Sequence, residues 1–125
     1  MKKLIIGLVG SLMVLTVSFA APKDSSYTGE IMDSQCAKNA SHDAMLKKEG
    51  MEKLIGDPKA SQMCTVNCVK KMGSKYVLYS AAKKTVYQLD DQQKPEQFAG
   101  QKVTVTGTLD KTTKTVHVAS IQAAS

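Results

Sequence analysis

The chain has 125 residues, with 17 lysines, no arginine and 11 acidic residues, which gives a formal net charge of +6. Arginine is the side chain that binds phosphate in a bidentate manner, and the lysines are spread along the chain, so the charge pattern argues against nucleic acid as a partner. The length is sufficient for one compact domain and not for two.

The first residues predict a cleaved export signal. Two lysines precede an apolar run from Leu4 to Val17, small residues follow at Ser18 and Ala20, and cleavage is expected after Ala20. The run is short for a membrane span, so we expect residues 1–20 to be removed and no stable span to remain. The mature chain would carry a net charge of +4 and work in the periplasm or outside the cell, where thiols tend to form disulfides.

The mature chain is expected to begin with a disordered N-terminus, because residues 21–26 are small, polar and proline-containing. Alternating side chains then predict a first strand over 27–33, in which Gly29 marks a bulge or a close approach of two backbones. Residues 34–73 have a helical pattern instead, which Gly50 is expected to interrupt. The helical segment is therefore an insertion after the first strand.

The clearest helix of this insertion is predicted from Pro58 to Met72. Asp57 is a suitable N-cap in front of a proline at the first helical position, and Gly73 is a typical C-terminal stop. Because residues four apart share one face of a helix, Cys64 and Cys68 are expected to lie on the same face.

The rest of the chain is β in character. Two hairpins are predicted, KYVLYS with KTVYQL and KVTVTGTLD with KTVHVASIQ, and the segment between them has room for one helical turn. Five short strands with a helical turn between the third and fourth are the plan of an OB-fold. We therefore expect an all-β or β+α fold over residues 27–122: a five-stranded, OB-fold-like, partly open barrel with a helical insertion at 34–73 between strands 1 and 2.

Several segments between Tyr27 and Ile121 are distinctive: GEIMDSQC, CTVNCVK, KYVLYS, VYQLDDQ, FAGQKVTVTGTLD and TVHVASI. Together they make the chain resemble a family of small exported bacterial proteins described as a domain of unknown function. The resemblance implies an OB-like barrel and an exported location. It implies no established activity, so no catalytic residue is assigned from it.

The candidates for chemistry are the three cysteines. In an exported protein we expect a disulfide between Cys36 and either Cys64 or Cys68, which would close a loop of about 30 residues and stabilise the domain by about 3 kcal/mol. A bridge between Cys64 and Cys68 is disfavoured, because side chains of a regular helix do not converge for the required dihedral. The alternative is a zinc or copper site formed by Cys36, His42, Cys64 and Cys68.

Other residues of interest have simpler explanations. His42 is either a metal ligand or a residue at a helix start, and both interpretations stay open. His117 alternates with valines and is expected to face solvent, and Asp33 is expected to cap a turn at the end of a strand. The methionines are expected to fill the core rather than to bind copper, and the tyrosines to pack in the sheet rather than to stack on bases.

The sequence contains no catalytic motif of the serine-elbow, phosphate-loop or zinc-protease type, and it has no C-x-x-C pair. We therefore expect an exported, non-catalytic binding or interaction module for an unknown protein or small ligand, with its insertion held by a disulfide from Cys36 and with no cofactor. A periplasmic zinc- or copper-binding protein is the alternative.

Overall fold

The computed structural model describes residues 15–18 and 20–124. Its elements are β1 (Ser25–Asp33), α1 (Ser34–Lys38), α2 (Asp43–Lys48), η1 (Glu52–Leu54), α3 (Pro58–Met72), β2 (Tyr76–Ser80), β3 (Thr85–Leu89), η2 (Lys94–Phe98), β4 (Lys102–Asp110) and β5 (Thr115–Ala123). The predicted order of strand, helical insertion, hairpin, helical turn and hairpin is confirmed. Most of the predicted signal, residues 1–14 and 19, lies outside the described residues, and within them no helix is long and apolar enough to cross a bilayer.

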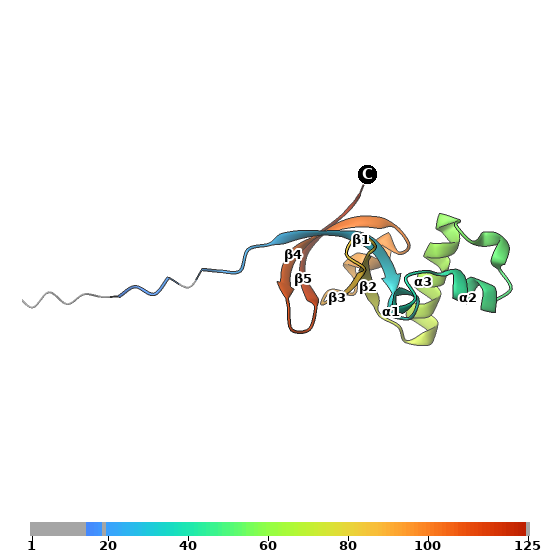
Figure 1. Ribbon diagram of the computed structural model, residues 1–125, viewed down its shortest axis with the longest axis horizontal. Coiled ribbons are helices and arrows are strands. Elements are labelled where there is room, and N and C mark those ends of the chain that lie inside the picture. The colour runs from blue at the N-terminus through green and yellow to red at the C-terminus, as the bar shows by residue number, and fades with distance from the viewer. Residues whose placement is uncertain (1–14, 19, 125) are drawn as a thin grey trace, which may run out of the picture.

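The five strands form a mixed sheet that closes into a ring in the order β1-β2-β3-β5-β4 (Figure 1). All neighbouring strands are antiparallel except β3 and β5, which run parallel and pair only through Gln88 with Thr115 and Leu89 with Val116. The expected five-stranded, partly open barrel with a helical insertion between strands 1 and 2 is confirmed as a ring with one short seam.

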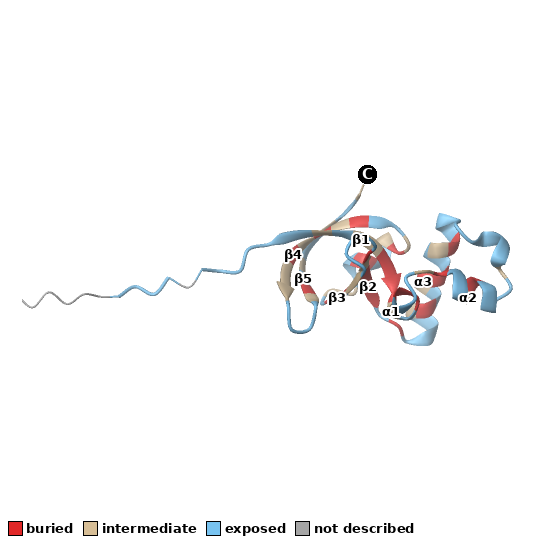
Figure 2. Ribbon diagram, viewed as in Figure 1, coloured by how far each residue is buried: buried red, intermediate tan, exposed pale blue. Residues whose placement is uncertain are grey.

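The interior of the ring is filled by side chains that alternate along the strands, because successive strand residues point to opposite faces. In β4 the buried positions are every second residue from Val103. Figure 2 shows the buried residues of the strands in red. The ring core consists of Ile31, Tyr76, Leu78, Tyr87, Leu89, Ala99, Val103, Val105 and Val116.

Strand β1 starts two residues earlier than the sequence suggested. Ser25 and Ser26 pair with β4, so they belong to the sheet and not to a disordered N-terminus. Gly29 is a point of close approach, as expected, since a Cβ atom there would lie 2.3 Å from the carbonyl oxygen of Tyr79. The bulge is elsewhere, at Thr106/Gly107 in the pairing of β4 with β5.

The insertion lies to one side of the ring (Figure 1). Helix α3 has the predicted bounds: the Asp57 side chain accepts a hydrogen bond from the backbone N–H of Lys59, and Gly73 takes a left-handed conformation with φ of 71°. Gly50, with φ of 71°, interrupts the helical segment as expected. The short helix α1 directly after β1 was not predicted as a separate element.

Candidate metal-ligand site at the junction of ring and insertion

A second buried cluster joins the ring to the insertion. It is formed by the end of β1, by α1, by one face of α3 and by β2, and it contains all three cysteines. Figure 2 shows the buried face of α3 turned towards β1 and α1. The cluster consists of Met32, Cys36, Ala37, Cys64, Cys68 and Val77.

Asp33 sits at the last position of β1 and is the N-cap of α1. Its Oδ2 accepts hydrogen bonds from the backbone N–H groups of Gln35 at 3.1 Å and Cys36 at 3.0 Å, so the expected capping role is confirmed. The residue is 0% exposed, and its second oxygen, Oδ1, has no hydrogen-bond partner among the described residues. A buried carboxylate oxygen without a partner is costly, and this one lies next to thiols.

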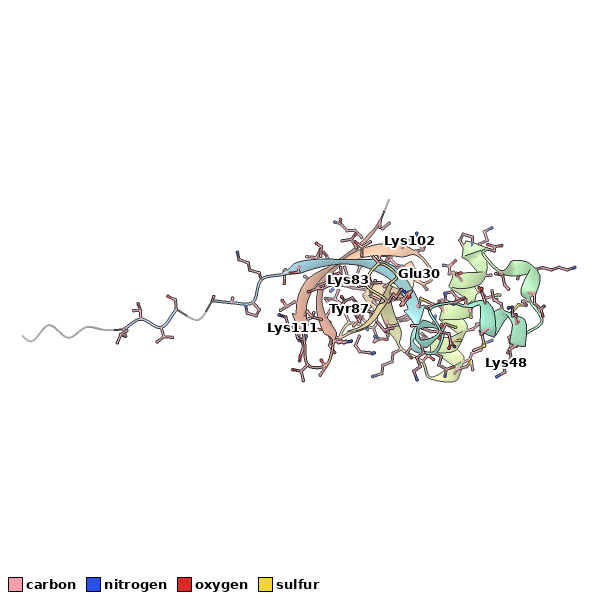
Figure 3. All side chains as sticks on the ribbon, viewed as in Figure 1. Glu30, Lys48, Lys83, Tyr87, Lys102 and Lys111 are labelled. Carbon is pink, nitrogen blue, oxygen red and sulfur yellow. The ribbon has the colours of Figure 1, made fainter. Side chains whose placement is uncertain are left out.

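His42 is buried, with 6% of its surface exposed, although it directly precedes α2. Its Nε2 lies 3.1 Å from Glu30 Oε1, and Figure 3 places Glu30 at the junction of ring and helices. A carboxylate only accepts, so Nε2 donates this hydrogen bond, and in the neutral imidazole Nδ1 keeps its lone pair. Nδ1 has no hydrogen-bond partner within the described part of the chain.

The thiols of Cys36 and Cys64 are in contact, with 3.9 Å between their sulfur atoms. This separation is well beyond the ~2.05 Å of a disulfide bond, and all three cysteines are free and buried. Cys36 comes from α1, and Cys64 and Cys68 lie on the buried face of α3, as the four-residue spacing predicted.

The surroundings keep these thiols protonated. Burial, followed by the nearby Asp33 carboxylate, raises the pKa of the Cys36 thiol, and burial likewise raises the pKa of Cys64. The pKa of Cys68 is raised to about 12 for the same two reasons. A thiol-exchange catalyst needs an accessible cysteine with a lowered pKa, so this arrangement argues against redox catalysis by these residues.

Four potential ligand atoms converge at this junction, one each from Asp33, Cys36, His42 and Cys64. All lie within 4.8 Å of one another, and all four residues are buried. Three of them belong to the set that the sequence proposed for a metal site. The fourth proposed residue, Cys68, is in the cluster but outside this group, and Asp33 takes its place.

Only a capping role was expected for Asp33, because its carboxylate comes close to Cys64 only after the chain has folded back on itself. The other candidates lie away from this group. His117 is on the surface, as expected, and its Nδ1 is 3.1 Å from Asp90 Oδ2. Tyr76 and Tyr87 pack in the ring core.

Fold and site together define a small β-ring protein with a buried thiol, imidazole and carboxylate cluster. Residues 69–124 match the family described as "Protein of unknown function (DUF5818)", so the expected likeness to a family of unknown function is confirmed over a shorter stretch than Tyr27 to Ile121. No curated protein and no solved structure matches the chain. The matched stretch holds the end of α3 and strands β2 to β5, and all members of the cluster except Val77 precede it.

Proposed function

We propose that the protein binds one zinc or copper ion through Cys36, His42 and Cys64, with Asp33 as the fourth ligand. The observation that carries the proposal is the convergence of these four buried ligand atoms within 4.8 Å. Sulfur, imidazole nitrogen and carboxylate oxygen are the donors that these metals use in proteins. The four residues come from the end of β1, from α1, from the α1–α2 connection and from α3, so only the folded chain brings them together.

The distance between the two sulfur atoms is consistent with this role. Two thiolates bound at about 2.3 Å to a tetrahedral ion would lie about 3.8 Å apart, and a trigonal ion would place them about 4.0 Å apart. The observed separation of Cys36 and Cys64 sulfurs is 3.9 Å. Little movement is therefore needed for both sulfurs to bind one ion.

The two atoms left without partners also support the proposal. Asp33 Oδ1 and His42 Nδ1 are both buried, and each belongs to a side chain whose other polar atom is already held. Metal-binding histidines usually donate their second ring nitrogen to a carboxylate, and here Glu30 is that carboxylate. A bound cation would provide the missing partner for both atoms.

The proposed role is to hold the ion and not to use it in catalysis. A site with four protein ligands is closed, whereas catalytic zinc sites keep one position open for water or substrate. The burial of Asp33, Cys36 and His42, which are at most 6% exposed, is consistent with a closed site. The β-ring then serves as the rigid scaffold that positions the ends of the insertion. We propose that this binding occurs after export, in the periplasm or outside the cell.

The direct test is native and denaturing mass spectrometry of protein purified without chelators, followed by Co²⁺ substitution. We expect one metal ion per chain, and a thiolate-to-cobalt charge-transfer band that Cys36→Ser and Cys64→Ser each weaken and that the double variant removes. Cys68→Ser, a change in the same cluster but outside the four ligands, is the matched control and should keep the band. His42→Gln should weaken binding by about 10- to 100-fold, as expected for a ligand or its support, while His117→Gln should not.

A disulfide between Cys36 and Cys64 is a second candidate, because these are the two sulfurs in contact. It would require the sulfurs to approach by almost 2 Å and would make the protein a stapled binding module for an unknown partner or small ligand. The same mass measurement separates the candidates. A mass lower by two hydrogens, with one alkylatable thiol and no metal, would refute the metal proposal and support the staple.

A further inference from the structure

Four of the five methionines that follow the predicted signal line one cavity in the insertion. The cavity has a volume of about 250 Å³, and its walls include Cys64 and Cys68. The four methionines are Met45, Met51, Met63 and Met72. The cavity therefore opens onto the side of α3 that carries the thiols.

Two of these methionines, Met63 and Met72, do not behave as the core filler that the sequence suggested, whereas Met45 packs against the cysteine cluster. Met32 fits that expectation, because it is 1% exposed, but Met63 is 40% exposed and Met72 is 49% exposed. An exposed methionine gains little from the hydrophobic effect, so packing does not explain two such side chains beside one cavity. Their shared feature is a thioether sulfur, which is a soft and uncharged metal ligand.

Thioether ligands distinguish copper from zinc, the two metals considered for the site. Thiolate and thioether sulfurs suit Cu(I), whereas zinc takes thiolate, imidazole and carboxylate ligands and not thioether. The cavity also contains Glu49, whose carboxylate attracts cations, and Lys71, which opposes it. A smaller cavity of about 180 Å³ is lined by Cys36 but contains only one methionine, Met45. The soft donors are thus concentrated on the Cys64 side.

We propose that the methionine-lined cavity is the entry site for Cu(I), which passes from it to the buried cysteines. This inference rests on the proposed metal-binding function and narrows its metal to Cu(I), which the thiolates and the imidazole suit better than the Asp33 carboxylate does. Cys64 connects the two places, because it both lines the cavity and belongs to the four converging ligands. In the transfer, Cu(I) exchanges thioether sulfur for the sulfur of Cys64 and then of Cys36. Each thiol that becomes a ligand releases one proton to solvent, and the oxidation state of copper does not change.

The first experiment follows the methionine methyl groups by NMR in reduced, ¹³C-methyl-labelled protein. Ag(I) serves as the redox-inert stand-in for Cu(I), and Zn²⁺ as the comparison metal. We expect Ag(I), but not Zn²⁺, to shift the methyl signals of Met63 and Met72, also when Cys36 and Cys64 are both replaced by serine. The Met32 methyl reports the inner site, because Met32 packs in the cysteine cluster and does not line the cavity.

The second experiment measures Cu(I) loading from a competing chelator under anaerobic, reducing conditions. The double variant Met63→Leu/Met72→Leu keeps apolar side chains of similar size at two exposed positions and removes the thioethers. We expect loading about tenfold slower, a loss of the size seen when supporting groups around a metal site are removed, with one Cu(I) still bound at the end. Adding Leu109→Met in β4 places one thioether outside the cavity and should not restore the rate.

The outcomes separate the two proposals. Unshifted Met63 and Met72 signals together with an unchanged loading rate, in a protein that still binds one ion through its cysteines, would overturn the entry site and leave the metal function intact. Recovery of the rate by Leu109→Met would also overturn it. If wild-type protein binds neither Cu(I) nor Zn²⁺, the metal function itself fails, and the entry site fails with it.

Discussion

Asp33 caps helix α1 and is also a proposed metal ligand, so replacing it tests both roles. The carboxylate holds the start of α1 through Oδ2 and belongs to the group of four converging ligands, and its Oδ1 has no hydrogen-bond partner among the described residues. Asp33→Ala removes both roles. Asp33→Asn retains an oxygen that can cap the helix but removes the negative charge, so the pair of variants separates stability from metal binding.

The expected changes in the free energy of unfolding follow from the two hydrogen bonds that Asp33 accepts. Loss of an N-cap costs about 1 kcal/mol, and the N–H of Cys36, which is buried, would be left without a partner at a cost of about 1–3 kcal/mol. We therefore expect Asp33→Ala to lower the free energy of unfolding by about 2–3 kcal/mol. Asparagine caps helices about as well as aspartate, so Asp33→Asn should lower it by less than about 1 kcal/mol.

The assay is urea unfolding of the reduced, metal-free protein, followed by circular dichroism. With a denaturant slope of about 1–1.5 kcal/mol per molar urea for a domain of this size, the Asp33→Ala midpoint should fall by about 2 M. Metal affinity is measured separately, and Asp33→Asn should weaken it by about 10- to 100-fold. Asp57→Ala removes the N-cap of α3, remote from the ligand group, and should leave the metal affinity unchanged.

Equal stability of the Asp33→Ala and Asp33→Asn proteins would refute the capping argument. Unchanged metal affinity of the Asp33→Asn protein would refute Asp33 as the fourth ligand and would make Cys68 the next candidate for that position, since it lies in the same cluster.

Three further predictions concern the rest of the chain. Gly29→Ala should destabilise the ring by about 1–3 kcal/mol, measured by thermal unfolding, because the new Cβ would overlap the carbonyl of Tyr79; an unchanged melting temperature would contradict this. The backbone N–H of Val118, followed by His117, lowers the pKa of Asp90. The ionised Asp90 carboxylate therefore adds to the free energy of unfolding above the usual carboxyl pKa of about 4, and this contribution is lost as the pH falls through the lowered pKa. The stability gap between wild type and Asp90→Asn should therefore narrow on acidification, and it should stay below about 1 kcal/mol because the pair is exposed. Terminal sequencing of the exported protein should begin at Ala21, and an intact N-terminus would contradict the predicted cleavage.

The sequence by itself was sufficient for the principal helix and for the strands, apart from the start of β1. Strand alternation depends on local side-chain patterning, and for β4 it predicted the bounds Lys102–Asp110. The start and end of α3 follow from Asp57, Pro58 and Gly73, which act through neighbouring backbone atoms. The shared face of Cys64 and Cys68 is a property of the helix repeat and needs no tertiary contact.

Short elements and contacts between residues distant in sequence could not be predicted from local sequence patterns. Helix α1 has five residues, too few to show a periodic pattern, and its start depends on the Asp33 side chain. The burial of His42 depends on Glu30, twelve residues earlier in β1, and both interpretations of this histidine were compatible with the sequence.

What only the tertiary structure decided is which groups meet. Packing α3 against the end of β1 places Cys64 beside Cys36 and Asp33, and it leaves Cys68 outside the group of four. The same packing gathers four methionines, spread over 28 residues of sequence, around one cavity. Local sequence sets the direction of each side chain along its own element, whereas distances between elements depend on how the whole chain fills its core. For this reason the sequence predicted the cysteines as a candidate site, but it did not predict that Asp33 and the methionines lie beside them.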